Sequence, residues 1–327
     1  MTPFGLISGY DGLVCDLDGV VVAGPTAIEH AVEAINALPV PVVFATNNAS
    51  RSPHAVGEAL RSLGVQVRDQ LVLTSSRAAA QVLGEQLAPG SAVMAVGGPG
   101  VAESLDEVGL LPTVPGDGTA VVAVLQGYGA GVTAADLGEA AHAVRAGARW
   151  VVTNEDATLP TERGPAPGNG ALVAAVRRAV EVDPEVIGKP HPPMYSMAAR
   201  GLGVEPARLL AVGDRLETDI AGAHATGMDA ALVLTGVHSV RDAASAPPER
   251  RPTHVIADLR GLLEEYPEAR RDGSWSIRGT GRATWDGGLV VEGEGLDAVR
   301  AALDVLWQEV DVGRISADTA GALLGNG

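Results

Sequence analysis

Short runs of valine, leucine and alanine alternate along most of the chain with longer stretches in which apolar residues recur at helical spacing. The short runs predict strands at residues 12–17, 40–45, 92–96, 120–125, 149–153, 209–213, 230–234 and 254–257. The longer stretches predict helices, among them 26–38, 53–63, 134–146, 170–181 and 217–226. The strand segments are apolar without alternation, as expected when helices cover both faces of a sheet. The order therefore predicts an α/β fold with a Rossmann-like parallel sheet.

The pattern changes in the last sixty residues. Residues 271–295 are rich in glycine and contain short alternating patches, and an amphipathic helix is predicted at 296–309. Three of the four tryptophans, Trp275, Trp285 and Trp307, lie in this part of the chain. We expect a small α+β appendage at 268–327 with an aromatic core of its own, and the sequence indicates no role for it.

Length and composition limit the classes of protein. A chain of 327 residues with 46% hydrophobic residues can form two or three domains, and its net charge of −17 argues against nucleic acid or an anionic membrane as a partner. Cys15 is the only cysteine, so no intrachain disulfide can form. The sequence contains no signal-peptide pattern and no apolar run long enough to cross a membrane. We expect a soluble, cytoplasmic protein.

Lys189 is the only lysine, because the other 22 basic residues in the Lys+Arg total of 23 are arginines. An ammonium is a compact point charge that fits between carboxylates and a phosphate oxygen where a planar guanidinium does not. Lys189 follows Gly188 and precedes Pro190, between two acidic segments of the chain. We therefore predict a specific role for Lys189 in a site.

Polar residues follow several predicted strands. Asp16 and Asp18 end the first strand, Thr46 ends the second, and Asp214 follows a later one, with Asp219 opening the next helix. Ligands of parallel α/β sheets bind outside the carboxyl ends of the strands. Carboxylate oxygens are the ligands that Mg²⁺ prefers. The pattern predicts a magnesium site at this edge.

Four segments carry a family resemblance. In order, they resemble motifs I to IV of the haloacid dehalogenase superfamily: Asp16-Leu17-Asp18-Gly19-Val20, Thr46-Asn47-Asn48, Gly188-Lys189-Pro190 and Gly213-Asp214-Arg215-Leu216-Glu217-Thr218-Asp219-Ile220. The long insert between the second and third motifs resembles the phosphatase subfamily with a large α/β cap, which includes NagD, p-nitrophenyl phosphatase and phosphoglycolate phosphatase relatives. Residues 153–160 and 164–170 resemble its cap loop. The resemblance covers residues 10–266.

The resemblance implies a mechanism. Asp16 is expected to be the nucleophile that forms an aspartyl-phosphate, and Asp18 the acid and base that protonates the leaving alkoxide and activates water. Lys189 is expected to neutralise the nucleophile and the phosphate. The resemblance also implies phosphate and substrate contacts by Thr46, Asn47, Asn48, Arg51, Asn154 and Asp156. It implies Mg²⁺ as cofactor, held by Asp16, Asp214 and the main chain of Asp18, with Asp219 supporting this shell.

The predicted domains are a phosphatase core at 1–75 and 186–266, a cap that selects the substrate at 76–185, and the appendage at 268–327. For an arginine- and alanine-rich sequence of actinobacterial type, the resemblance points first to glycerol 3-phosphate as substrate. Phosphoglycolate, pyridoxal phosphate and nucleotide monophosphates are alternatives. A phosphomutase and a receiver-like phospho-acceptor switch are alternative functions, although receivers are single domains of about 120 residues. We expect a small phosphorylated substrate as partner, no nucleic acid or membrane, and leave a homodimer open.

Overall fold

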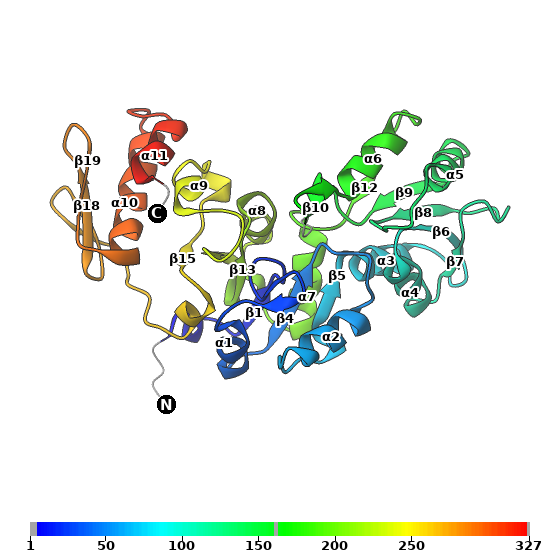
Figure 1. The fold of residues 1–327 in the computed structure, drawn as a ribbon, viewed down its shortest axis with the longest axis horizontal. Coiled ribbons are helices and arrows are strands. Elements are labelled where there is room, and N and C mark those ends of the chain that lie inside the picture. Colours follow the sequence, from blue (N-terminus) through cyan, green and yellow to red (C-terminus); the bar gives the residue numbers. More distant parts are fainter. Residues whose placement is uncertain (1–4, 160–162, 326–327) are drawn as a thin grey trace. The chain divides into compact units, whose positions relative to one another are not determined.

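The computed structural model describes residues 5–159 and 163–325 (Figure 1). Pro160, the last residue of the first predicted cap-loop segment, lies outside these ranges. The chain divides into two compact units, which are described separately: unit 1 comprises Met1–Ala23, Ala27–Val42 and Val204–Gly327, and unit 2 comprises Gly24–Thr26 and Val43–Gly203. The predicted domain boundaries at 75, 186 and 268 stay a prediction.

Unit 1 contains four parallel strands in the order β15-β14-β13-β1. They are β1 (Gly12–Cys15), β13 (Leu209–Gly213), β14 (Asp229–Val233) and β15 (His254–Ile256). Every residue of β1 and β13 is buried, as the lack of alternation predicted. Cys15 pairs with Val212, so these two strands end side by side.

The helical segments of unit 1 that precede residue 268 are short. They are η1 (Leu6–Gly9), α1 (Ala31–Ala37), η3 (Pro206–Arg208), η4 (Leu216–Ile220), α8 (Ala221–His224), α9 (Val240–Ala244), η5 (Pro248–Arg250) and η6 (Leu259–Leu262). The predicted helix at 26–38 is wrong at its start, because the short strand β3 (Thr26–Ala27) occupies its first residues. Another short strand, β2 (Val22–Ala23), precedes β3. His30 has a left-handed φ of 64°, which a right-handed helix cannot continue. The predicted helix at 217–226 is a π-helical turn, η4, followed by the four residues of α8.

The last part of unit 1 is the predicted α+β appendage. Its antiparallel sheet has the order β16-β17-β18-β19, formed by β16 (Arg270–Asp272), β17 (Trp275–Arg278), β18 (Gly281–Trp285) and β19 (Leu289–Glu292). Helix α10 (Gly295–Asp311) packs on β17 and β18, and α11 (Ala317–Leu324) packs on α9 and α10 (Figure 1). The core is mainly aliphatic rather than aromatic, since Ala283, Ala301, Ala302 and Val305 are buried and Trp285 packs against them.

Unit 2 contains a five-stranded parallel sheet in the order β12-β9-β8-β6-β7. Its strands are β6 (Ala92–Val96), β7 (Leu111–Thr113), β8 (Ala123–Gln126), β9 (Arg149–Val152) and β12 (Glu185–Val186). In the same unit β4 (Val42–Thr46) pairs in parallel with β5 (Val72–Thr74), and β10 (Thr158–Leu159) pairs with β11 (Ala166–Pro167). The predicted α/β class is confirmed.

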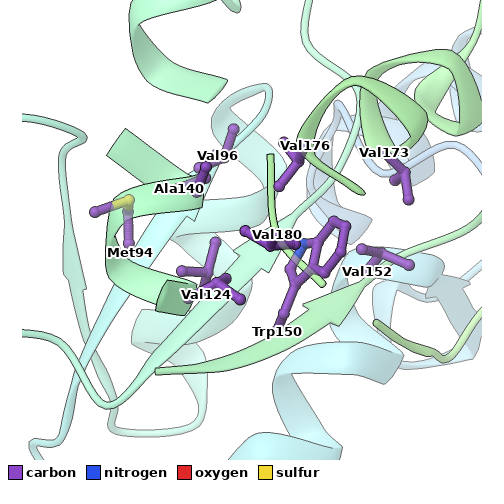
Figure 2. Packing of buried hydrophobic residues seen from close by; sticks show 11 residues of the cluster. Met94, Val96, Val124, Ala140, Trp150, Val152, Val173, Val176 and Val180 are labelled. Carbon is purple, nitrogen blue, oxygen red and sulfur yellow. The ribbon is translucent and has the colours of Figure 1, made fainter. Parts of the chain in front are cut away.

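Unit 2 contains seven helical segments among the described residues. They are α2 (Pro53–Ser62), η2 (Asp69–Leu71), α3 (Ser75–Gln86), α4 (Pro99–Glu107), α5 (Ala134–Arg145), α6 (Asn169–Arg177) and α7 (Pro192–Leu202). Of these, α4, α5 and α6 pack on its five-stranded sheet. Figure 2 shows side chains from the sheet meeting those of α5 and α6 around Trp150. The indole N–H of Trp150 donates to Gln126 Oε1 at 3.0 Å, which satisfies the one polar atom of this large side chain. Within residues 5–159 and 163–325, no helix has the length and apolar character of a membrane span.

Candidate active site

Three carboxylates meet at the ends of two adjacent strands in unit 1. Asp16 follows β1, Asp214 follows β13, and Asp219 lies on η4. One oxygen from each lies within 4.8 Å of the others, and the three residues are only 9%, 1% and 2% exposed, respectively. The Asp16 amide donates to the Val212 carbonyl at 2.9 Å, which continues the strand pairing up to the first carboxylate. The parallel register therefore brings Asp16 next to the β13 terminus.

The Asp214 side chain is tightly enclosed by the main chain. Its Oδ2 accepts from the Val237 amide at 2.8 Å. Gly19 and Gly236 approach so closely that a β-carbon at either would overlap the Asp214 carboxylate, and Gly19 also has a φ of 80°, which favours glycine. The Thr235 hydroxyl donates to the Gly19 carbonyl at 2.7 Å and holds these two segments together.

A π-helical turn carries Asp219. The Arg215 amide donates to Asp219 Oδ2 at 3.1 Å, and the Arg215 carbonyl accepts from the Asp219 amide at 2.9 Å. Gly213 at the end of β13 leaves the space that Asp219 occupies, because a β-carbon there would overlap it. Such π turns in helices are often found at functional sites. Here the turn directs the Asp219 carboxylate back toward the end of β13.

Asp18 differs from Asp16 in exposure. Asp18 is exposed, whereas Asp16 two residues before it is buried. Asp18 lies in a tight turn that begins after Asp16, since the Leu17 carbonyl accepts from the Val22 amide and the Gly19 amide donates to the Val22 carbonyl at 2.8 Å. A group that protonates a leaving oxygen and then deprotonates water must reach both. The exposed position of Asp18 is compatible with that role.

In unit 2, a polar loop follows β4. Thr46 is 2% exposed, and its hydroxyl accepts from the Asn48 amide at 3.0 Å. Asn48 Oδ1 accepts from the amide of Ser50 at 3.0 Å and from its hydroxyl at 2.7 Å. Arg51 donates to the Ala55 carbonyl at 3.0 Å. Asn48 and Arg51 thus help to shape this loop and the start of α2.

The Asn47 side chain is bonded to both main-chain groups of Lys189. Asn47 Oδ1 accepts from the Lys189 amide at 2.9 Å, and Asn47 Nδ2 donates to the Lys189 carbonyl at 3.0 Å. Lys189 is only 4% exposed and precedes a cis peptide to Pro190. The predicted motif II residue and the only lysine therefore share a paired contact within unit 2.

The predicted cap-loop residues join the same network. Asn154 is 4% exposed, and its Nδ2 donates to the Asn47 carbonyl at 2.7 Å. Both oxygens of Asp156 lie 3.2 Å from Asn47 Nδ2 and accept from it. Asn169 at the start of α6 donates to the Asn154 carbonyl at 2.7 Å. This loop is therefore connected to Asn47 through side chains and main chain.

The predicted site residues thus form two local groups. The group in unit 1 contains Asp16, Asp214 and Asp219, and the group in unit 2 contains Asn47, Asn154, Asp156 and Lys189. Sequence reasoning missed the Asn47 side chain as the centre of the second group, as well as Ser75, whose hydroxyl donates to the Asn47 carbonyl at 2.6 Å. Asn47 and Lys189 are 142 residues apart, so no local pattern indicated their pairing.

Two family models match the chain. One, described as haloacid dehalogenase-like hydrolase, matches residues 13–111, and a second, described as HAD-hydrolase-like, matches residues 186–262. The two matched segments contain Asp16, Asp18, Asn47, Lys189 and Asp214.

Several known proteins are similar over most of the chain. D-glycerol 3-phosphate phosphatase of Mycobacterium tuberculosis is 42% identical over 91% of this chain and 86% of its own length. 5′-Nucleotidase YutF of Bacillus subtilis is 37% identical over 76% of this chain and 96% of its own length. The crystal structure of a glycerol phosphate phosphatase from Mycobacterium tuberculosis in complex with magnesium has a TM-score of 0.85 and 40% identity, and the match covers 93% of this chain and 92% of that chain.

Proposed function

The chain belongs to the haloacid dehalogenase-like hydrolases, and we propose that it is a Mg²⁺-dependent phosphatase that hydrolyses D-glycerol 3-phosphate. The cluster of Asp16, Asp214 and Asp219 is the observation that carries the reaction type. Ionised carboxylates so close together repel one another, and burial removes the water that would screen them. A cation held between them offsets both effects.

The donor set fits Mg²⁺. The cluster offers carboxylate oxygens only, and Mg²⁺ binds through few carboxylates while it keeps water and substrate phosphate as further ligands. We assign Asp16 and Asp214 as ligands, together with the main-chain carbonyl of Asp18, and Asp219 as support for this shell. When bound, Mg²⁺ would reduce the repulsion between the phosphate and the attacking carboxylate.

In the proposed reaction, Asp16 attacks first. Its carboxylate oxygen forms a bond to phosphorus while the bond between phosphorus and the alcohol oxygen breaks, and Asp18 gives the leaving oxygen a proton. Asp18 then takes a proton from water as the water oxygen attacks the same phosphorus. The bond to Asp16 breaks, and inorganic phosphate leaves. The burial of Asp16 and the exposure of Asp18 support the assignment of Asp16 as nucleophile and Asp18 as acid and base.

Lys189 supplies positive charge in this proposal. Its ammonium would stabilise the charge that develops on the phosphoryl oxygens, with Thr46 and the main-chain amides near Asn47 as hydrogen-bond donors. The other predicted contacts, by Asn48, Arg51, Asn154 and Asp156, stay proposals of the same kind.

The match across the appendage favours glycerol 3-phosphate over a nucleotide. Residues 268–327 are about 18% of the chain, so a match over 91% must include at least half of them. The nucleotidase match covers 76% and does not require any of them. The relative that acts on D-glycerol 3-phosphate thus resembles more of this chain than the nucleotidase does.

A substrate comparison tests the proposal. We expect the highest kcat/KM with D-glycerol 3-phosphate among four classes, the others being 5′-nucleotide monophosphates, phosphoglycolate and pyridoxal phosphate. A tenfold higher kcat/KM for any of these three would overturn the substrate. Absence of Mg²⁺-dependent phosphate release from all four would overturn the enzyme class. The homodimer stays a prediction, and sedimentation velocity of the purified chain tests it. The cytoplasmic location also stays a prediction.

A further inference from the structure

We propose that the side chains of Asn47 and Asp156 position Lys189 for the reaction. In this arrangement, Asn47 fixes the main chain of Lys189, and Asp156 fixes the orientation of Asn47. Both are positioning residues, because they act on the reaction through the lysine. The proposal rests on the phosphatase activity proposed above and deepens it.

The first step concerns the main chain of Lys189. Asn47 engages both its amide and its carbonyl, at 2.9 and 3.0 Å, in the way that one strand residue pairs with another. A single hydrogen bond leaves a residue free to pivot, whereas two bonds to its N–H and C=O restrict that motion. The starting point and direction of the lysine side chain are then determined. Displacement of a catalytic group by about 1 Å can cost about a hundredfold in rate.

The second step concerns the orientation of the Asn47 amide. Its Nδ2 has two hydrogens, of which one points to the Lys189 carbonyl and the other to the Asp156 carboxylate. If the amide were flipped, its NH₂ would face the Lys189 N–H and its oxygen would face a carbonyl and a carboxylate. Donor would oppose donor, and acceptor would oppose acceptors. The acceptor oxygens of Asp156 thus favour the orientation that holds Lys189.

The third step concerns the support of Asn47 itself. Its main-chain carbonyl accepts from Ser75 at 2.6 Å and from Asn154 at 2.7 Å. On the other side, a β-carbon at Gly188 would lie 2.7 Å from Asn47 Oδ1, so the segment before Lys189 packs directly on the amide. Asn154 also accepts from the Asp156 amide at 3.1 Å. The loop that follows β9 therefore supplies both the Asp156 carboxylate, which accepts from the Asn47 side chain, and the Asn154 amide, which donates to the Asn47 carbonyl.

Substitutions at two positions separate the steps. Asn47→Asp keeps the acceptor for the Lys189 amide but replaces the donor with an oxygen that faces the Lys189 carbonyl and Asp156. Asp156→Asn keeps an oxygen that can accept from Asn47, whereas Asp156→Ala removes it. Asn36→Asp on the exposed side of α1 makes the same chemical change as Asn47→Asp and serves as the matched control.

A double-mutant cycle with Lys189→Ala tests the proposal in the full-length protein, with D-glycerol 3-phosphate as substrate and phosphate release as readout. We expect Asn47→Asp to lower kcat by about 10- to 100-fold with less than a threefold change in KM. In the Lys189→Ala background, the same substitution should lower kcat by less than twofold. Asp156→Asn should retain at least fivefold more activity than Asp156→Ala. Thermal unfolding of each variant confirms that it is folded.

The outcomes are distinct. Equal losses from Asn47→Asp in the presence and in the absence of Lys189 would overturn the proposal, as would a loss confined to KM. Equal activity of Asp156→Asn and Asp156→Ala would overturn the part assigned to Asp156. If the unaltered protein released no phosphate from any phosphomonoester, the proposed function would fail instead.

Discussion

Acidification is expected to destabilise the protein through His254, the first residue of β15. The Tyr10 hydroxyl donates its one hydrogen to Asp229 Oδ2 at 2.7 Å. His254 Nε2 lies 2.8 Å from the same hydroxyl, so it must donate to the Tyr10 oxygen. The other ring nitrogen, Nδ1, is buried and has no hydrogen-bond partner among the described residues. A second proton on this ring would therefore be buried without an acceptor.

Burial is the main cause that lowers the pKa of His254 to about 4, and the positive charges of Arg278 and Arg300 contribute, while Asp229 opposes them. An unfolded histidine has a pKa of about 6.5, so the unfolded state binds more protons between these two values. The stabilisation is complete above pH 6.5 and is lost as the pH falls toward 4. Linkage gives a loss of about 2 kcal/mol between pH 7 and 5, and about 3 kcal/mol by pH 4.

Urea unfolding of the protein and of His254→Gln at pH 7, 6 and 5 measures this contribution. Glutamine keeps an N–H that can donate to Tyr10 but does not titrate, so the difference between the two proteins isolates the histidine. We expect the unaltered protein to lose about 2 kcal/mol more than the variant between pH 7 and 5. Parallel stability curves over this range would refute the reasoning.

Three further substitutions test the site. Asp16→Asn should lower phosphate release by at least about a thousandfold with unchanged circular dichroism, because the amide is not a nucleophile, and a loss of less than about tenfold in Mg²⁺-dependent release would contradict that role. Lys189→Arg should lower kcat by at least about tenfold at saturating Mg²⁺, because the buried position suits a compact ammonium; near-normal kcat would show that any cation suffices. Gly19→Ala should cost about 1–2 kcal/mol in urea unfolding and weaken Mg²⁺ in an activity titration, because its β-carbon would overlap Asp214; unchanged values of both would contradict the enclosure described above.

The strands and the carboxylate cluster followed from local sequence patterns. Each predicted strand is present, and its ends lie within three residues of the predicted ones. Buried parallel strands are continuous apolar runs, which the sequence shows directly. Asp16 and Asp214 were brought together correctly because parallel strands end at one edge. The short strands β5, β7 and β12 escaped notice, since two or three residues give no periodicity.

Other features depend on contacts that no local pattern encodes. The backbone of His30 delays the start of α1 although the residues before it have helical spacing. The aliphatic core of the appendage arises because Ala301 and Ala302 on α10 meet Ala283 on β18, which the tryptophan content did not indicate. The pairing of Asn47 with Lys189 joins segments 142 residues apart. The resemblance therefore implied a substrate contact for Asn47 but not its pairing with Lys189.

The burial of the only lysine has a consequence for covalent chemistry. Lys189 is only 4% exposed, so its side-chain amine is shielded from acylating and alkylating reagents, and the arginines that carry the rest of the positive charge do not react with them. Lysine-directed reagents and modifying enzymes thus gain access to this chain's one ε-amine only when the surroundings of Lys189 open. Its rate of labelling by such a reagent reports the opening of that segment alone, without a background from other lysines.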